Sequence, residues 1–227
     1  MKRSVEFTLD STFAQQCYEQ LQLEIIQGIC KPGEKLKIEP IKNRFGIGQS
    51  PVREALSRLA AFGLVEVEEN KGFRVAAISE RDIRDTYAVF TEIETLALVW
   101  AMERGDEEWE TQIVAQLYRL STVELSASPV SPMLWAQRNY DFHVALISGC
   151  NSKTLLEIRR HLYMKFDRYC QMSYRSNYSA HGNHRAHQEL ADAVLKRDII
   201  HAKALLCEHI NAPLEDIIAE FKQHNLF

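Results

Sequence analysis

The sequence predicts a mainly α protein: an N-terminal winged helix-turn-helix followed by an all-α bundle of six or seven helices. Three observations favour this fold class. Residues 1–77 contain three helix-like segments and a two-stranded hairpin pattern, residues 78–227 show only helical periodicity, and no repeat or glycine-rich phosphate loop interrupts either part. We therefore expect two domains, residues 1–77 and 78–227, joined near residue 78 without a flexible linker.

The bulk composition excludes several classes of protein. The 227 residues suffice for two cores, and 46% hydrophobic with 26% charged residues is typical of a soluble globular protein. The N-terminus lacks the apolar run of a signal peptide, and no run approaches the ~20 apolar residues that span a membrane. Five cysteines without a C-x-x-C spacing favour reduced thiols in the cytoplasm. We expect no membrane association.

Residues 46–64, GIGQSPVREALSRLAAFGL, organise the N-terminal part. Ser50 is expected to cap a short helix, and Pro51 fits its first position, where a missing N–H costs nothing. Val52, Leu56 and Leu59 repeat at helical spacing and form one apolar stripe to bury.

Arg53 and Ser57 share the opposite face of this helix, as a recognition helix presents its side chains to a DNA major groove. Helical patterns at residues 13–28 and 39–45 precede it, and alternating residues at 64–67 and 73–75 predict a hairpin wing. An amphipathic helix alone is more often plain scaffold. The joint arrangement predicts binding to double-stranded DNA.

The segment from residue 18 to residue 76 resembles the DNA-binding domain of GntR-family bacterial transcription factors through KPGEKL, PVREALSRL and GLVEVEENKGFRVA. The resemblance implies that Ser50, Arg53 and the wing tip at Lys71 and Gly72 touch the operator. The family usually has a further arginine where this chain has Gln49, which can read an adenine edge but adds no charge.

Net charge gives weaker support for nucleic-acid binding. Residues 1–77 hold 11 Lys and Arg against 10 Asp and Glu, a net charge of +1, and residues 78–227 hold 16 against 21, a net charge of −5. DNA binding is therefore expected to rely on a dimer and on a local basic patch, with strong salt dependence. The patch consists of Arg44, Arg53, Arg58 and Lys71.

Residues 78–227 predict helices near 79–104, 106–125, 133–147, 151–174, 184–196 and 199–222. Ser79 and Asp106 are expected to cap the first two of these helices, and Asp198 the last. The apolar positions expected to face inward include Ile83, Tyr87, Phe90, Ile93, Leu96, Ala97, Trp100, Ile113, Leu117, Leu120, Leu155, Ile158, Leu162 and Phe166.

Histidine spacing is compatible with a metal site inside this bundle, although a lone histidine on a helix is more often a satisfied or surface side chain. Asn139 and His143 lie four residues apart and therefore on one helix face. His187 and His209 each lie eleven residues from Asp198, or roughly 16 Å of helix at 1.5 Å per residue. In an antiparallel hairpin the two imidazoles would be level, so three histidines and an amide could converge on one ion with positions left open for a ligand.

The region from residue 83 to residue 217 resembles the FCD ligand-binding domain of the FadR subfamily of GntR regulators. The resemblance implies a divalent metal ion, zinc first with nickel or manganese as alternatives, held by Asn139, His143, His187 and His209. It also implies a small carboxylate effector. Asn139 stands where the family often has an acid, which removes a negative charge, and Phe90 replaces an arginine that commonly precedes the glutamate matching Glu94.

These features predict a homodimeric, ligand-responsive transcriptional repressor and not an enzyme. Two other interpretations remain open. Three histidines around an open coordination position would suit a metal-dependent hydrolase, although no Glu or Asp stands out as its general base. A purely structural metal with no effector is the other alternative.

Overall fold

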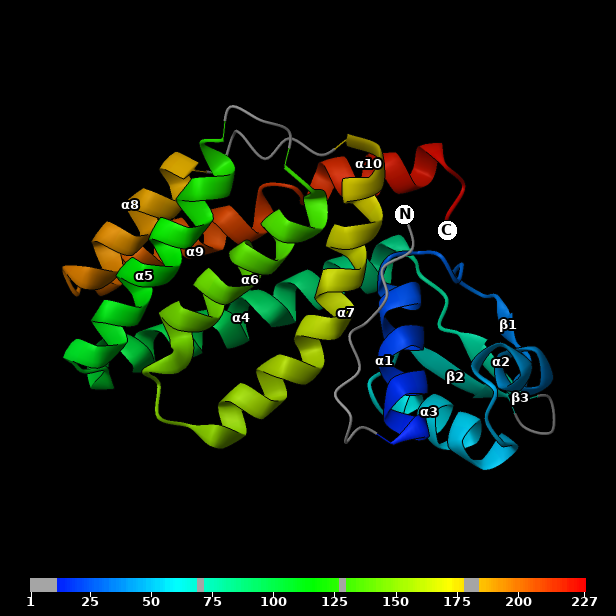
Figure 1. The fold of residues 1–227 in the computed structure, drawn as a ribbon. Coiled ribbons are helices and arrows are strands. Elements are labelled where there is room, and N and C mark those ends of the chain that lie inside the picture. The colour runs from blue at the N-terminus through cyan, green and yellow to red at the C-terminus, as the bar shows by residue number, and fades with distance from the viewer. Residues whose placement is uncertain (1–11, 69–71, 127–129, 178–183) are drawn as a thin grey trace.

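The computed structural model describes residues 12–68, 72–126, 130–177 and 184–227. Two parts lie side by side, and we call them the head and the bundle (Figure 1). The head consists of α1 (Phe13–Ile26), β1 (Lys35–Leu36), α2 (Ile38–Phe45), α3 (Gln49–Ala61), β2 (Val65–Glu68) and β3 (Gly72–Val75). The bundle consists of α4 (Glu80–Arg104), α5 (Glu107–Glu124), α6 (Pro132–Ser148), α7 (Lys153–Asn177), α8 (His184–Leu195), α9 (Ile199–Asn211) and α10 (Leu214–Gln223).

The head is a winged helix-turn-helix, as predicted. α1 and α3 pack together over one apolar core that includes Leu21, Leu56 and Leu59. β3 is the central strand of an antiparallel sheet in the order β1-β3-β2, with Val65 opposite Val75. Strand β1 was not predicted, because two residues give no periodicity and only their pairing with β3 defines the strand.

Helix α3 does not begin as the sequence suggested. Gly48 is the N-cap and makes no side-chain capping bond, and the helix starts at Gln49. The prediction that Ser50 caps the helix is therefore wrong. Pro51 is tolerated at the third helical position because the first four N–H groups of any helix lack an intrahelical partner.

The predicted caps of the bundle helices are confirmed. The side chains of Ser79, Asp106 and Asp198 accept hydrogen bonds from the backbone N–H groups of Asp82, Trp109 and His201. The helix predicted at 199–222 is interrupted, since α9 ends at Asn211 and α10 begins after Pro213. Proline lacks an N–H and its ring clashes with the preceding turn, so a continuous helix is disfavoured there.

Most predicted inward positions of the bundle are buried or half-buried, but two are exposed. Leu96 of α4 is 40% exposed and Ile158 of α7 is 49% exposed. Both lie on the outward side of long helices, where apolar periodicity extends beyond the core. In the described ranges, the bundle has seven helices, and none of the described helices is long and apolar enough to cross a membrane.

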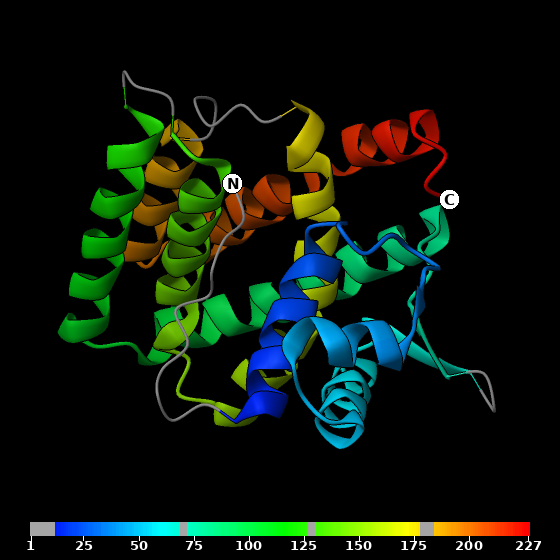
Figure 2. The same cartoon turned by 45° about the vertical axis from the view of Figure 1, so that its right-hand side comes forward.

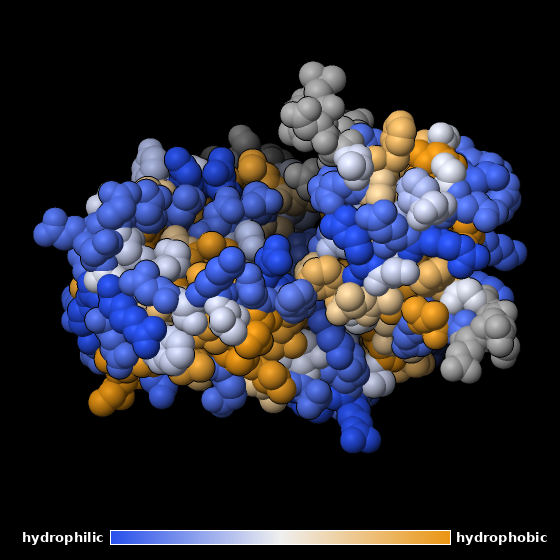
Figure 3. Space-filling view, turned by 90° about the horizontal axis from the view of Figure 1, so that it is seen from below, coloured by the Kyte–Doolittle hydropathy of each residue, from blue (hydrophilic) through white to orange (hydrophobic). Residues whose placement is uncertain are grey.

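Helix α7 runs along the boundary between the two parts and contacts both of them (Figures 1 and 2). Its Met164 belongs to the core of the head, and its His161 ring lies 4.5 Å from the ring of Phe62. Arg168 donates a hydrogen bond of 2.8 Å to the carbonyl of Ala76, just before the bundle begins. Seen from below, the two parts carry separate apolar patches on a largely hydrophilic surface (Figure 3).

Candidate DNA-reading face and histidine cluster

The outer face of α3 presents the predicted DNA-reading residues together. The side chains of Gln49, Ser50, Arg53 and Ser57 are all exposed, whereas Val52 is fully buried on the opposite face. The spacing of 49, 53 and 57 places three of these residues on one line along the helix. A rigid helix with an uncapped, exposed N-terminus and polar side chains can enter a major groove and contact phosphates.

The remaining basic residues of the predicted patch are differently placed. Arg44 makes an ion pair of 3.0 Å with Glu24 and is half exposed. Arg58 lies over the ring of Tyr18, with its guanidinium carbon 4.2 Å from the ring centroid, so it faces α1 and not the outer side of α3. Lys71 lies outside the described residues. Gly72 begins β3 with a φ of +99°, and apart from its chain neighbours no described residue lies within 4 Å of where a Cβ would stand.

Three of the four predicted metal ligands meet inside the bundle. His143 of α6, His187 of α8 and His209 of α9 each offer a ring nitrogen, and these atoms lie within 4.8 Å of one another. The Nε2 atoms of His143 and His209 are 3.2 Å apart, and the ring centroids of His187 and His209 are 4.7 Å apart. The level placement expected from the hairpin at Asp198 is therefore confirmed.

Burial keeps the imidazoles of His143 and His209 neutral by lowering their pKa values. Desolvation, reinforced by the neighbouring His209 and His187, lowers the pKa of His143 well below 6.5. Desolvation and His187 lower the pKa of His209 to about 3. Neutral imidazoles have free ring lone pairs at neutral pH, which is the protonation state that binds a metal ion.

Glu124, at the end of α5, was not anticipated from the sequence. Its Oε1 lies 2.9 Å from Nδ1 of His187 and accepts a hydrogen bond of 3.2 Å from the indole of Trp135. The side chains of both Glu124 and His187 are fully buried. A carboxylate at Nδ1 places the proton there and leaves the Nε2 lone pair free. Nothing in the local pattern around residue 124 signals this contact, because 63 residues separate the partners.

Two buried polar atoms without a described hydrogen-bond partner are available to bind an ion at the cluster. Nε2 of His187 and Oδ1 of Asn139 are buried and have no hydrogen-bond partner among the residues that the structure describes. Such atoms carry a desolvation cost unless something binds them. The three imidazoles form a donor set that fits a divalent transition metal, and Asn139, one turn before His143 on α6, would add an amide oxygen.

A cavity of about 470 Å³ adjoins the cluster and is lined by Asn139, His143 and His209. Arg159 of α7 and Glu94 of α4 also line it, joined by two hydrogen bonds of 2.8 and 2.9 Å. Both residues are almost completely buried. Phe90 of α4 stands where the family commonly has an arginine. The guanidinium of Arg159 lies 5.7 Å from the ring centroid of Phe90, so α7 supplies a cation at this place instead of α4. The sequence alone did not reveal that Arg159 takes the place of that arginine.

Comparison with known families identifies both parts of the chain. Residues 13–75 match the family described as bacterial regulatory proteins, gntR family, and residues 85–212 match the FCD domain. The chain belongs to the GntR family of bacterial regulatory proteins. It is a DNA-binding transcriptional regulator with an FCD domain, and the predicted fold class is confirmed.

Two curated relatives span most of this GntR-family chain. The HTH-type transcriptional repressor GlaR of Escherichia coli (strain K12) is 35% identical over 202 residues, which cover 87% of this chain and 92% of GlaR. The HTH-type transcriptional regulator BphR of Paraburkholderia xenovorans (strain LB400) is 34% identical, covering 90% of this chain and 84% of BphR.

Solved structures support the same architecture. McbR/YncC of E. coli superposes with a TM-score of 0.75 at 19% identity, covering 93% of this chain and 99% of that protein. A GntR transcriptional regulator from Rhodococcus sp. RHA1 superposes with a TM-score of 0.71 at 21% identity, covering 92% and 99%. At these identities the likeness establishes the fold.

Proposed function

We propose that this regulator is a cytoplasmic, homodimeric repressor whose affinity for its operator is controlled by a small carboxylate bound beside a metal ion in the bundle. The observation that carries the proposal is the joint presence of the histidine cluster and of Arg159 around one cavity. Zinc is the expected ion, with nickel and manganese as alternatives. The division into residues 1–77 and 78–227 is part of the same proposal.

Within the cavity each polar group has a distinct role. Asn139, His143, His187 and His209 would hold the ion, and the ion would supply an electrophilic centre for a carboxylate oxygen. Arg159 adds a fixed positive charge at the same cavity. A guanidinium matches a carboxylate in two parallel hydrogen bonds, so an incoming acid competes with Glu94 for Arg159.

That competition offers a route from the cavity to the head. Glu94 belongs to α4, which begins directly behind the wing, and Arg159 belongs to α7, which packs on α1. Lys165 of α7 also makes an ion pair of 2.5 Å with Asp82 in the first turn of α4. Weakening the ion pair between Glu94 and Arg159 reduces the attraction that holds α4 against α7. The effector releases DNA only if it binds the non-operator arrangement more tightly, and the coupling is reciprocal.

Dimerisation through the bundle is supported by apolar surface on α4. Val89 and Leu96, seven residues apart, are 46% and 40% exposed and lie on one helix face. A dimer would place two α3 helices on successive major-groove turns about 34 Å apart. Light scattering at several concentrations tests this, and a monomer that still binds operator DNA tightly would contradict it.

The DNA-binding part is tested by fluorescence anisotropy with DNA flanking the protein's own gene, against scrambled DNA, at two salt concentrations. We expect the Arg53→Ala variant to lose the preference for operator DNA by about tenfold or more. Arg119→Gln is the matched control, since Arg119 is exposed on α5, away from α3. Unchanged operator preference in Arg53→Ala would refute the proposed reading face.

The metal and effector part is tested with the double variant His187→Ala/His209→Ala. We expect loss of metal binding, measured by elemental analysis after dialysis, and loss of the carboxylate response in the anisotropy assay, with DNA binding retained. A full carboxylate response in the metal-free variant would contradict the site. Metal binding without any response to a panel of small acids would instead indicate a structural ion.

A further inference from the structure

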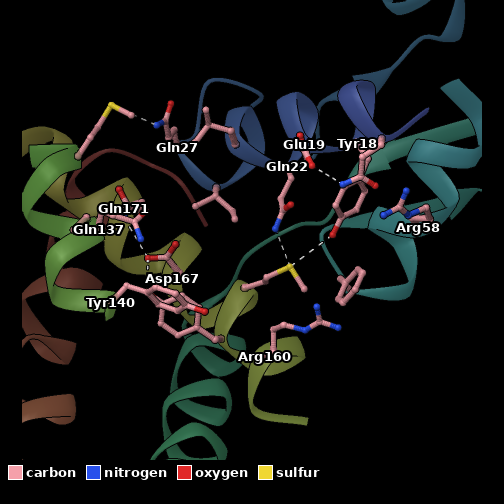
Figure 4. A pocket seen from close by; sticks show the side chains of 18 residues that line it. Tyr18, Glu19, Gln22, Gln27, Arg58, Gln137, Tyr140, Arg160, Asp167 and Gln171 are labelled. Atoms are coloured by element: carbon pink, nitrogen blue, oxygen red, sulfur yellow. Dashed lines mark hydrogen bonds between the residues drawn. The ribbon is translucent and has the colours of Figure 1, made fainter. Parts of the chain in front are cut away.

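A second cavity of about 730 Å³ lies between the head and the bundle. α1 and α3 line it from the head, and α6 and α7 line it from the bundle (Figure 4). Its volume is within the range of about 300–1,000 Å³ that is usual for small-molecule sites. It is distinct from the cavity beside the histidines, although the rings of Tyr140 and Tyr163 border both.

One end of this interdomain cavity is acidic. Asp167 is half buried and accepts hydrogen bonds from the amide of Gln171 at 3.2 Å and the hydroxyl of Tyr163 at 3.4 Å. Both donors are neutral, and in the described part of the chain Asp167 makes no ion pair. Burial raises the pKa of Asp167 to about 6, against smaller opposing effects from its two hydrogen bonds and from the charge of Arg159. A carboxylate in this state gains free energy when a cation binds it.

The other end is rich in hydrogen-bond donors. Arg58 and Arg160 both lie close enough to Tyr18 to lower the pKa of its hydroxyl, against the larger opposing effect of burial. Neither guanidinium makes an ion pair with any residue that the structure describes. The amide of Gln22 and the hydroxyl of Tyr18 point at the sulfur of Met164, at 2.9 and 3.9 Å. A thioether is a weak acceptor, so these donors suit a stronger one.

We propose that the interdomain cavity binds a small zwitterion of the amino-acid class, with its ammonium group at Asp167 and its carboxylate at Arg58 and Arg160. Figure 4 shows Asp167, Gln171 and Tyr140 on one side of the cavity and Arg58 and Arg160 on the other. Glu19 also lines the arginine side, where its carboxylate accepts a hydrogen bond from Gln15. An anion alone would leave Asp167 without a cation, and a cation alone would leave Arg58 and Arg160 without an acidic partner among the described residues. A zwitterion matches both, and the neutral Gln22 and Tyr18 supply further donors for its carboxylate.

This site goes beyond the proposed function, because it adds a second ligand at a different place. Arg58 belongs to the DNA-reading helix α3, and Asp167 belongs to α7. A molecule held by both would fix the head relative to the bundle. The ligand would therefore bind the free and the operator-bound protein with different affinities. The ratio of these two affinities equals the factor by which the ligand changes the affinity of the protein for DNA.

The test uses the purified full-length protein and isothermal titration calorimetry with each of the common α-amino acids. Acetate and methylammonium serve as probes of the two charged ends. We expect at least one amino acid to bind, and we expect acetate and methylammonium to bind at least about tenfold more weakly than it does. No binding by any amino acid, or equal binding by acetate, overturns the proposal.

Variants locate the binding. Asp167→Asn keeps an acceptor for Gln171 and Tyr163 but removes the charge, and Arg160→Gln removes an exposed cation. Each variant should reduce the affinity for the amino acid by about tenfold or more and leave the melting temperature of the protein unchanged. The matched controls are Asp192→Asn, whose carboxylate also accepts from a glutamine but on the surface of α8, and Arg119→Gln on α5. Wild-type affinity in both cavity variants overturns the assignment.

Discussion

Glu124 Oε1 lies 2.9 Å from Nδ1 of His187, and neither side chain is exposed to solvent. The contact holds the imidazole so that Nε2 faces the other two histidines, and it supplies a negative charge near a site where Asn139 provides none. In the proposed metal site, Glu124 would thus compensate in part for the neutral amide.

Replacing Glu124 by Gln should weaken metal binding. The amide can still accept from Nδ1, but the negative charge that raises the basicity of the imidazole is lost. We expect the affinity for zinc to fall about 10- to 100-fold in a competition titration with a chromophoric chelator. The control is Glu108→Gln on the same helix, whose exposed carboxylate accepts a hydrogen bond from Gln112. Equal zinc affinity in Glu124→Gln and Glu108→Gln would contradict this role.

The metal-free protein should lose stability as the pH falls below the ordinary histidine pKa of 6.5. His209 has a pKa of about 3 in the folded chain, so between these values the unfolded chain binds the extra proton. Stability therefore rises with pH across this window, by up to about 1.4 kcal/mol per pH unit for each such histidine.

Urea unfolding of chelator-treated protein at pH 5 and pH 7 measures this effect, and His209→Gln should reduce the pH dependence. Asp167, whose pKa is raised to about 6, acts in the opposite direction, so the comparison between wild type and variant isolates the histidine. The same pH dependence in wild type and variant would argue against a neutral, buried His209.

The buried pair of Arg159 and Glu94 should show strong coupling. Arg159→Met leaves the Glu94 carboxylate buried without its partner and should destabilise the fold by about 3–5 kcal/mol. Adding Glu94→Gln removes that charge, so the double variant should recover part of the loss in urea unfolding. If the double variant lost more unfolding free energy than the two single variants lose together, this account would be ruled out.

Gly105 should not tolerate a side chain. A Cβ there would stand 2.2 Å from Cε3 of Trp109, a buried ring whose indole donates to the carbonyl of Ala145. We expect Gly105→Ala to cost about 1–3 kcal/mol of stability, through displacement of that ring. Gly48→Ala is the control, since its Cβ would meet nothing closer than 3.8 Å. Similar melting temperatures for the two variants would refute the steric argument.

Local rules accounted for much of the fold. Capping by Ser79, Asp106 and Asp198 depends on a few adjacent residues, and the structure has all three. Local rules did not predict the start of α3, the break before α10 or strand β1. A competing short-range effect or a distant pairing partner explains each of these differences. α3 begins one residue before the expected cap, α10 is separated by Pro213, and β1 exists only because β3 pairs with it.

The sequence by itself determined the winged head, the helical bundle and the level placement of His187 and His209, because helical periodicity and equal spacing from Asp198 are properties of the chain order. The meeting of His143 with these two residues depends on the tertiary packing of α6. The tertiary structure decided which side chains support that cluster. Glu124 reaches His187 across 63 residues, and Arg159 reaches Glu94 across 65. Such contacts depend on how helices pack, and helix packing leaves no periodic signal at the two residues that meet.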